Sequence, residues 1–103
     1  MKRYMLVLQF AFSSVEDYDA MIRLEDDLER SLCQLAKVDG HDAGSGEMNF
    51  FIFTDNARQT FEEAGYVIQR ARLPLKAAAY RLVEGEEHIR LWPIDSVEPF
   101  VVL

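Results

Sequence analysis

The sequence predicts an α+β domain in which two helices cover one face of an antiparallel β-sheet. Two helical apolar patterns alternate with short, strongly apolar segments, and a glycine-rich turn joins two of those segments directly. Half of the 103 residues are apolar and 28% are charged, a composition that supports one hydrophobic core. We therefore expect residues 1–103 to form a single domain, with an apolar C-terminal tail at residues 93–103.

The first strand and the first helix are predicted from the N-terminal third of the chain. Residues 3–10 are apolar on both faces, a pattern typical of a central strand. Ser14 and Asp17 have the spacing of a helix-capping pair. Apolar residues then recur every three or four positions to about Leu32, which predicts an amphipathic helix.

A β-hairpin is predicted next, because two apolar segments flank the turn-forming residues 43–46. We expect a three-residue loop, which places Val38 opposite Phe50 and Ala36 opposite Ile52. A two-residue loop that places Asp42 opposite Glu47 would pair like charges and is disfavoured.

The remaining elements complete a recognisable order. A second helix is predicted from about Asn56 to Arg70, with Thr54 or Asp55 as its cap, and strands are predicted at residues 76–83 and 88–92. The order βαββαβ, followed by one extra C-terminal strand, is that of a ferredoxin-like sandwich. Right-handed crossovers place both helices on one face of the sheet, so the other face is left open.

The open face is expected to mix polar and apolar side chains. In the predicted register it carries Lys37, Asp39, His41, Glu47, Asn49, Phe51 and Phe53, with Arg3, Met5, Val7 and Gln9 from the first strand. Because a large exposed apolar patch usually marks an interface, we expect a second copy or the C-terminal tail to cover this face. Asp39, Asn49, Phe51 and Phe53 are the expected ligand or interface residues, and a ligand pocket is the alternative to an interface.

Three residues are weak catalytic candidates. The predicted register makes His41 and Glu47 cross-strand neighbours, and a histidine held by a carboxylate can act as a general base. Glu25 falls inside the apolar stripe of the first helix, where a carboxylate is unusual. The alternatives are that the turn residues are solvated and that Glu25 lies at the edge of the stripe or pairs with an arginine. Since Cys33 is the only cysteine and no metal-ligand spacing is present, we expect no metal and no cofactor.

Charge and cysteine usage limit the partners and the compartment. The net charge of −7 repels nucleic acid and anionic membranes, and it would attract a basic protein partner. The apolar run near the N-terminus is too short for a signal peptide, and no stretch is long enough to span a membrane. We expect a cytoplasmic protein.

The residues Val38 to Asp55, VDGHDAGSGEMNFFIFTD, resemble a hairpin pattern found in small uncharacterised bacterial proteins. The N-terminal strand and the LEDDL run at residues 24–28 are similar too. The resemblance implies a bacterial protein and supports the hairpin. It implies no activity, because that group has no assigned function.

Two functions fit these observations. The first is a small non-catalytic binding or interaction protein, of the kind represented by immunity proteins, that self-associates as a homodimer through its open sheet face. The second is a small dimeric α/β-barrel enzyme with a pocket near His41 and Glu47.

Overall fold

The computed structural model describes residues 2–102 and confirms the predicted order of elements. Its helices and strands are β1 (Tyr4–Ala11), α1 (Val15–Leu32), β2 (Ala36–Gly44), β3 (Glu47–Thr54), α2 (Ala57–Ala71), β4 (Leu75–Leu82) and β5 (Ile89–Trp92). The strands form one antiparallel sheet in the order β2-β3-β1-β4-β5. This is the ferredoxin-like order with β5 added beside β4, as the sequence predicts.

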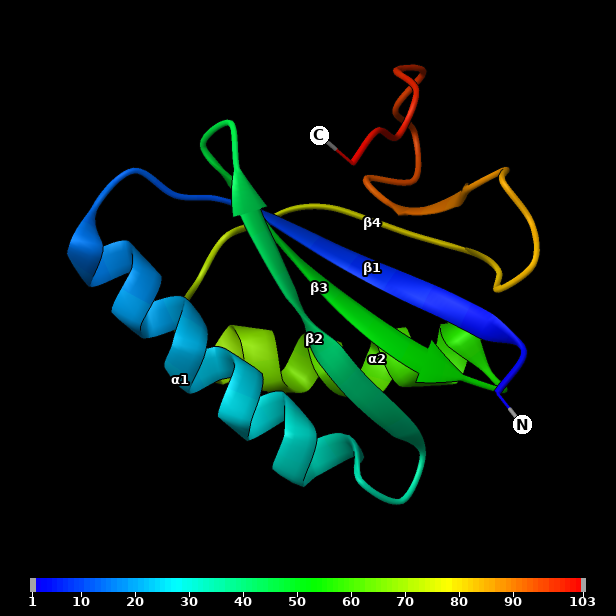
Figure 1. Cartoon of the computed structure of the whole chain (residues 1–103), viewed down its shortest axis with the longest axis horizontal. Coiled ribbons are helices and arrows are strands. Elements are labelled where there is room, and N and C mark those ends of the chain that lie inside the picture. Colours follow the sequence, from blue (N-terminus) through cyan, green and yellow to red (C-terminus); the bar gives the residue numbers. More distant parts are fainter. Residues whose placement is uncertain (1, 103) are drawn as a thin grey trace.

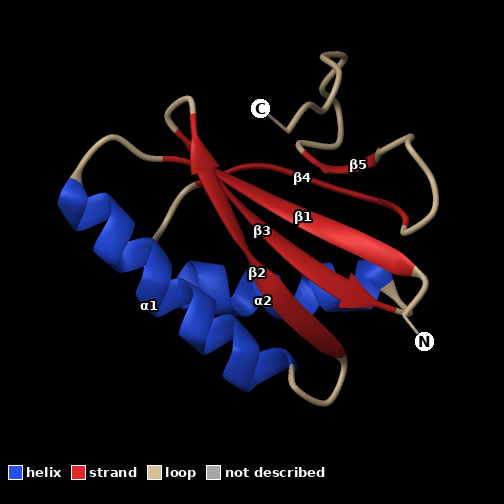
Figure 2. Ribbon diagram, viewed as in Figure 1, coloured by secondary structure: helices blue, strands red, loops and turns tan. Residues whose placement is uncertain are grey.

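Both helices pack on the same face of the sheet (Figures 1 and 2). Side chains alternate along a strand, so every second residue of β1 and β3 points toward the helices. The core formed between the layers contains Leu6, Leu8, Phe10, Met48, Phe50 and Ile52 from these strands, and Met21, Leu24, Leu28, Leu32, Ala64, Val67 and Ile68 from the helices. Within residues 2–102, no helix lies over the opposite face (Figure 1), which confirms the predicted arrangement of layers.

The helix starts are set by short polar side chains. Ser14 caps α1, because its Oγ accepts a hydrogen bond from the Asp17 backbone N–H at 3.1 Å. The cap of α2 is Asn56, whose Oδ1 accepts from the Gln59 N–H at 3.1 Å. The predicted caps, Thr54 and Asp55, are wrong because Thr54 is still the last residue of β3 and the chain turns into the helix only at residue 56.

The hairpin between β2 and β3 differs from its predicted register. Its loop has two residues, Ser45 and Gly46, with φ angles of 54° and 75°. Positive φ at both positions matches a type I′ turn, whose twist suits an antiparallel hairpin. Gly44 therefore faces Glu47 and Asp42 faces Asn49, so no like charges meet.

A β-bulge at Asp39 then shifts the register of the rest of β2. Val38 pairs with Ile52 instead of Phe50, and Ala36 pairs with Thr54 instead of Ile52. The bulge is followed by Gly40, whose φ of 154° is a conformation that side chains rarely adopt. Because a bulge inserts one residue, side chains on its two sides in the chain do not follow one continuous alternation. Val38 and His41 therefore point to the same face of the sheet.

Among residues 2–102, no helix is both long enough and apolar enough to cross a membrane.

The turn type predicts opposite effects for substitutions at its two positions. Ser45→Asn should stabilise the protein by about 0.5 kcal/mol, because asparagine tolerates the left-handed conformation better than serine. Gly46→Ala should destabilise it by about 1–2 kcal/mol, because a Cβ is strained at positive φ. Urea unfolding of both variants measures these changes. Equal effects of the two substitutions would contradict a type I′ turn.

Candidate functional site

His41 and Glu25 form a pair on the helix side of the sheet. His41 lies opposite Phe50, a core residue, because the two-residue loop at Ser45 and Gly46 sets this register. Its Nδ1 lies 3.0 and 3.1 Å from the two carboxylate oxygens of Glu25 on α1. The rings of Tyr18 and Phe50 pack edge-on against the imidazole. The structure thus joins two residues that the sequence singled out for separate reasons.

The predicted pairing of His41 with Glu47 is wrong. Glu47 faces Ala11 and Gly44, and it points to the open side because its neighbour Met48 lies in the core. The sheet therefore separates the two side chains, and they cannot line one pocket. The physical reason is the two-residue loop, which pairs Gly44 with Glu47 and His41 with Phe50, where a three-residue loop was expected.

Four predicted residues do lie on the open face. Glu47, Asn49, Phe51 and Phe53 alternate with the core residues of β3. Glu47 and Asn49 are buried, whereas Phe51 and Phe53 are partly exposed. Asp39, at the bulge, is exposed beside this face. The two ends of the open face differ: the C-terminal segment covers one end, and the other end contains a hollow.

The C-terminal segment covers the polar end of the open face. The Gln9 Nε2 donates to Asn49 Oδ1 and to the backbone oxygen of Val101, each at 3.0 Å. Gln9 and Asn49 are both buried, so this amide pair holds residue 101 against β1 and β3. Of the two covers expected, a second copy or the C-terminal tail, the tail is the one that contacts this face at the end near Gln9.

A charged pair lies beside the amide pair. The Lys76 ammonium contacts Glu47 Oε2, and the Glu47 side chain is only 7% exposed. The second carboxylate oxygen, Oε1, is buried without a hydrogen-bond partner among the described residues. A cavity of about 340 Å³ lies between this pair and the C-terminal segment, and Arg90 and Ser96 also line it.

Two contacts to the Phe100 ring also hold the C-terminal segment. The His88 ring packs on Phe100 with ring centres 5.0 Å apart, and the Arg90 guanidinium lies 5.9 Å from the same ring. Arg90 also donates to the backbone oxygen of Glu98. Burial lowers the pKa of His88 below its ordinary value, and the positive charge of Arg81 lowers it further.

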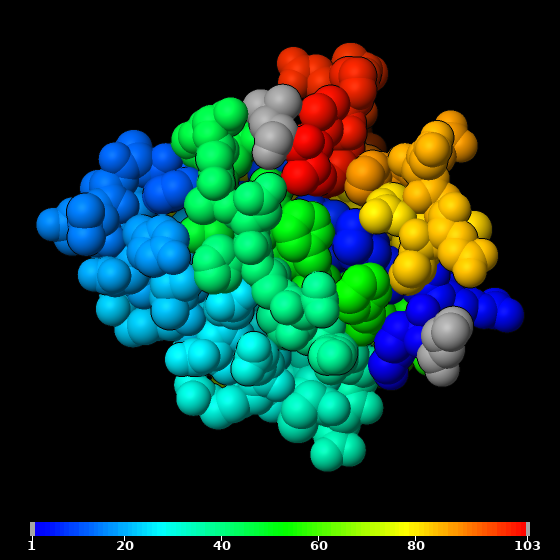
Figure 3. Space-filling model, viewed as in Figure 1, coloured from blue at the N-terminus to red at the C-terminus, as the bar shows by residue number. Residues whose placement is uncertain are grey.

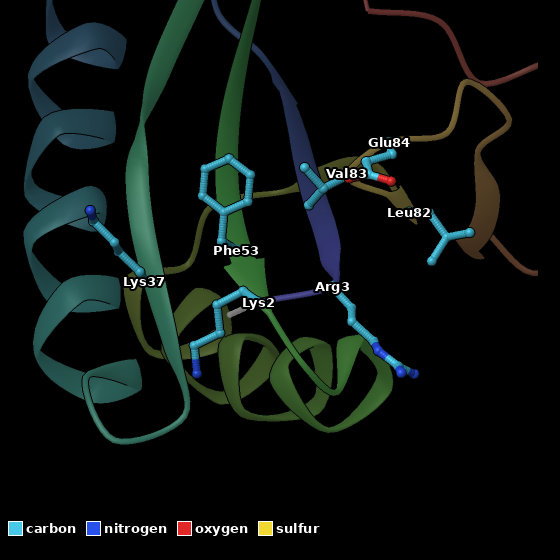
Figure 4. Close-up of a pocket in the computed structure, with 7 residues that line it drawn as sticks. All are labelled: Lys2, Arg3, Lys37, Phe53, Leu82, Val83 and Glu84. Carbon is cyan, nitrogen blue, oxygen red and sulfur yellow. The ribbon is translucent and has the colours of Figure 1, made fainter.

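The other end of the open face contains a basic, apolar hollow (Figure 4). Phe53 stands at its centre, with Lys37 from β2 on one side and Val83, just after β4, on the other. Lys2 and Arg3 lie at its lower edge in this view. This hollow has a volume of about 590 Å³.

Exposed apolar side chains are concentrated in the last part of the chain. Ten large hydrophobic side chains in residues 2–102 are strongly exposed, and seven of them lie within residues 82–101. We call these seven the C-terminal apolar surface: Leu82, Val83, Ile89, Trp92, Ile94, Val97 and Val101. In Figure 3 the segment coloured yellow to red lies along the upper right of the molecule.

Comparisons of the chain with protein-family models, with curated proteins and with solved structures give no match.

Sequence reasoning missed several residues that build these features. Lys76 and Arg90 were not singled out, and neither were Lys2, Leu82 and Val83. The last three meet because the Val83 backbone N–H donates to the Arg3 backbone oxygen at 2.9 Å, a contact across some 80 positions that no local pattern indicates. The bulge did have a signal, since an isolated glycine inside a strand often marks one.

Replacing Gln9 by methionine tests whether the amide pair holds the C-terminal segment. The change leaves Asn49 Oδ1 and the Val101 oxygen without their donor, so we expect a loss of about 1–3 kcal/mol in unfolding free energy. Hydrogen exchange of residues 93–102 should also become faster. Gln34→Met is the matched control, because Gln34 is exposed. Unchanged exchange in Gln9→Met would contradict the proposed role of the amide pair.

His88 predicts a specific pH dependence of stability. Because its pKa is lowered in the folded protein, the unfolded chain binds the proton first as the pH falls below the ordinary value of 6.5. The contribution of His88 is therefore fully present above pH 6.5, and it is lost as the pH falls through the lowered pKa. His88→Gln should flatten this part of the profile in urea unfolding from about pH 8 to about pH 5. Parallel wild-type and variant profiles would show that His88 titrates normally.

Proposed function

We propose that this protein is a non-catalytic interaction protein that self-associates through its C-terminal apolar surface. The observation that carries the proposal is the concentration of seven strongly exposed hydrophobic side chains in one fifth of the chain. Within this set Ile94 is 82% exposed and Val97 is 97% exposed. Isolated exposed apolar residues are ordinary, but seven within one fifth of the chain support an interaction surface around β5, with Trp92 beside α2 and Val101 on the open face.

A second copy is the partner that the fold favours. β5 has only four residues and is an edge strand of the sheet, so its outer backbone groups have no neighbouring strand among the described residues. Along the chain, the residues of the C-terminal apolar surface belong to this strand or lie shortly before or after it. Most soluble oligomers are symmetric assemblies of identical chains, in which one such patch contacts its own counterpart.

The three catalytic candidates do not meet in one site, and this favours a non-catalytic protein. His41 and Glu25 pair on the helix side, whereas Glu47 contacts Lys76 on the open side. A general base must lie within hydrogen-bond reach of the group it acts on, together with the other groups of the site. The His41–Glu25 pair contacts aromatic rings instead, and this supports a structural role at the edge of the core.

The double variant Ile94→Asp/Val97→Asp tests self-association. Both positions are strongly exposed, so the folded monomer should tolerate the change. An interface that buries them would have to desolvate two carboxylates, and we expect the dimer dissociation constant to rise at least about tenfold. Sedimentation velocity over a concentration series measures the effect, with the wild type forming a dimer as concentration rises.

Val15→Asp is the matched control. Val15 is equally apolar and 75% exposed, but it lies at the start of α1, outside the C-terminal apolar surface. This control should dimerise like the wild type. A wild type that stays monomeric at every concentration, or a double variant that dimerises as tightly, would exclude the proposal.

A further inference from the structure

The basic hollow around Phe53 has the features of a ligand site. We propose that it binds a small amphipathic anion, namely an organic carboxylate or sulfonate with a compact apolar body. The inference goes beyond self-association and does not depend on it, although Leu82 and Val83 belong both to the hollow and to the C-terminal apolar surface.

The size of the hollow suits a small organic molecule. Its volume of about 590 Å³ lies within the range of about 300–1,000 Å³ that is typical of small-molecule sites. Phe53 forms the floor and Val83 stands beside it (Figure 4), and Leu82 is also among the lining residues. An apolar body placed here would bury surface on both sides, which is the main source of affinity for such ligands.

The wall beside Phe53 is held in place by hydrogen bonds. The Arg81 Nη1 lies within hydrogen-bond distance of the backbone oxygens of Leu82 (3.0 Å), Val83 (2.8 Å) and Gly85 (3.0 Å). The Val83 N–H bonds to the Arg3 oxygen and joins this wall to the start of β1. A site that is already formed loses less conformational entropy when a ligand binds.

The charge around the hollow favours an anion. Lys2, Arg3 and Lys37 come from two segments of the chain and line the hollow with Glu84, and in Figure 4 their charged ends extend outward from Phe53 at its rim. The Lys2 ammonium lies 4.0 Å from Asp55. Within residues 2–102, the charged groups of Arg3 and Lys37 lie within ion-pair distance of no carboxylate.

This local excess of positive charge contrasts with the rest of the chain. The net charge is −7, and α1 alone carries seven carboxylates and two arginines. A cation would be repelled by the rim, and inorganic phosphate would gain nothing from the apolar floor. The combination therefore selects a ligand that has both an anionic group and an apolar body.

Fluorescence titration with anilinonaphthalene sulfonate, an amphipathic anion, tests the proposal on the full chain. Lys37→Glu should weaken binding about tenfold, because the change replaces an attraction by a repulsion. Lys37 is exposed, so the variant should fold. Arg23→Glu makes the same change of charge at an exposed position on α1 and should bind like the wild type.

Competition separates the two parts of the ligand. Octanoate should displace the probe, whereas octylammonium, which has the same chain length and the opposite charge, should not. Inorganic phosphate should displace it far less than octanoate does. Equal displacement by octylammonium or by phosphate would overturn the proposal, and so would unchanged binding by Lys37→Glu.

The variant Ile94→Asp/Val97→Asp distinguishes this inference from self-association. If the probe occupies the basic hollow, this variant should bind it with wild-type affinity when both are titrated at a concentration at which the wild type is monomeric. Loss of probe binding in this variant, with normal binding by Lys37→Glu, would place the probe on the C-terminal apolar surface and exclude the site at Phe53.

Discussion

Both helices pack on the same face of the five-stranded sheet (Figure 1), and the rest of this structure follows from the open face that this leaves. On the covered face, β1 and β3 contribute large apolar side chains that pack against the stripes of α1 and α2. The open face also contains Phe51 and Phe53, and leaving both of these apolar side chains in water would cost free energy. The protein covers part of this face with its own C-terminal residues, and it uses polar side chains to hold them there.

The way the C-terminal residues are held explains why polar groups are buried on the open face. An irregular segment that crosses a sheet brings unpaired backbone oxygens with it, and these need donors. Gln9 supplies one to the oxygen of Val101 while also bonding to Asn49. An apolar residue at position 9 would fit the sheet equally well but would leave that oxygen unsatisfied. The segment leaves Ile94, Val97 and Val101 exposed, and these are three of the seven residues of the C-terminal apolar surface.

Local patterns in the sequence predict much of this architecture. The Ser14 cap, both helices and the open-face positions of Glu47, Asn49, Phe51 and Phe53 all follow from spacing. The two-residue loop and the bulge at Asp39 do not follow from alternation: the loop places His41 opposite Phe50, and the bulge keeps Val38 opposite Ile52 on the same side of the sheet. The hollow at Phe53 was beyond prediction because its lining residues come from segments far apart in the chain, at positions 2–3, 37, 53 and 82–84. Their meeting depends on the hydrogen bonds that Arg81 and Arg3 make with residues 82–85.

Charge is distributed unevenly between the helix layer and the sheet. α1 carries a net charge of −5, whereas Lys2, Arg3 and Lys37 gather on the far side of the sheet. Such a separation is an electric dipole that points through the sheet. An approaching anion is repelled at long range by the total charge, yet it is turned toward the sheet side as it comes within about a Debye length, roughly 8–10 Å at ordinary ionic strength. Raising the ionic strength would therefore weaken the long-range repulsion and the short-range guidance together.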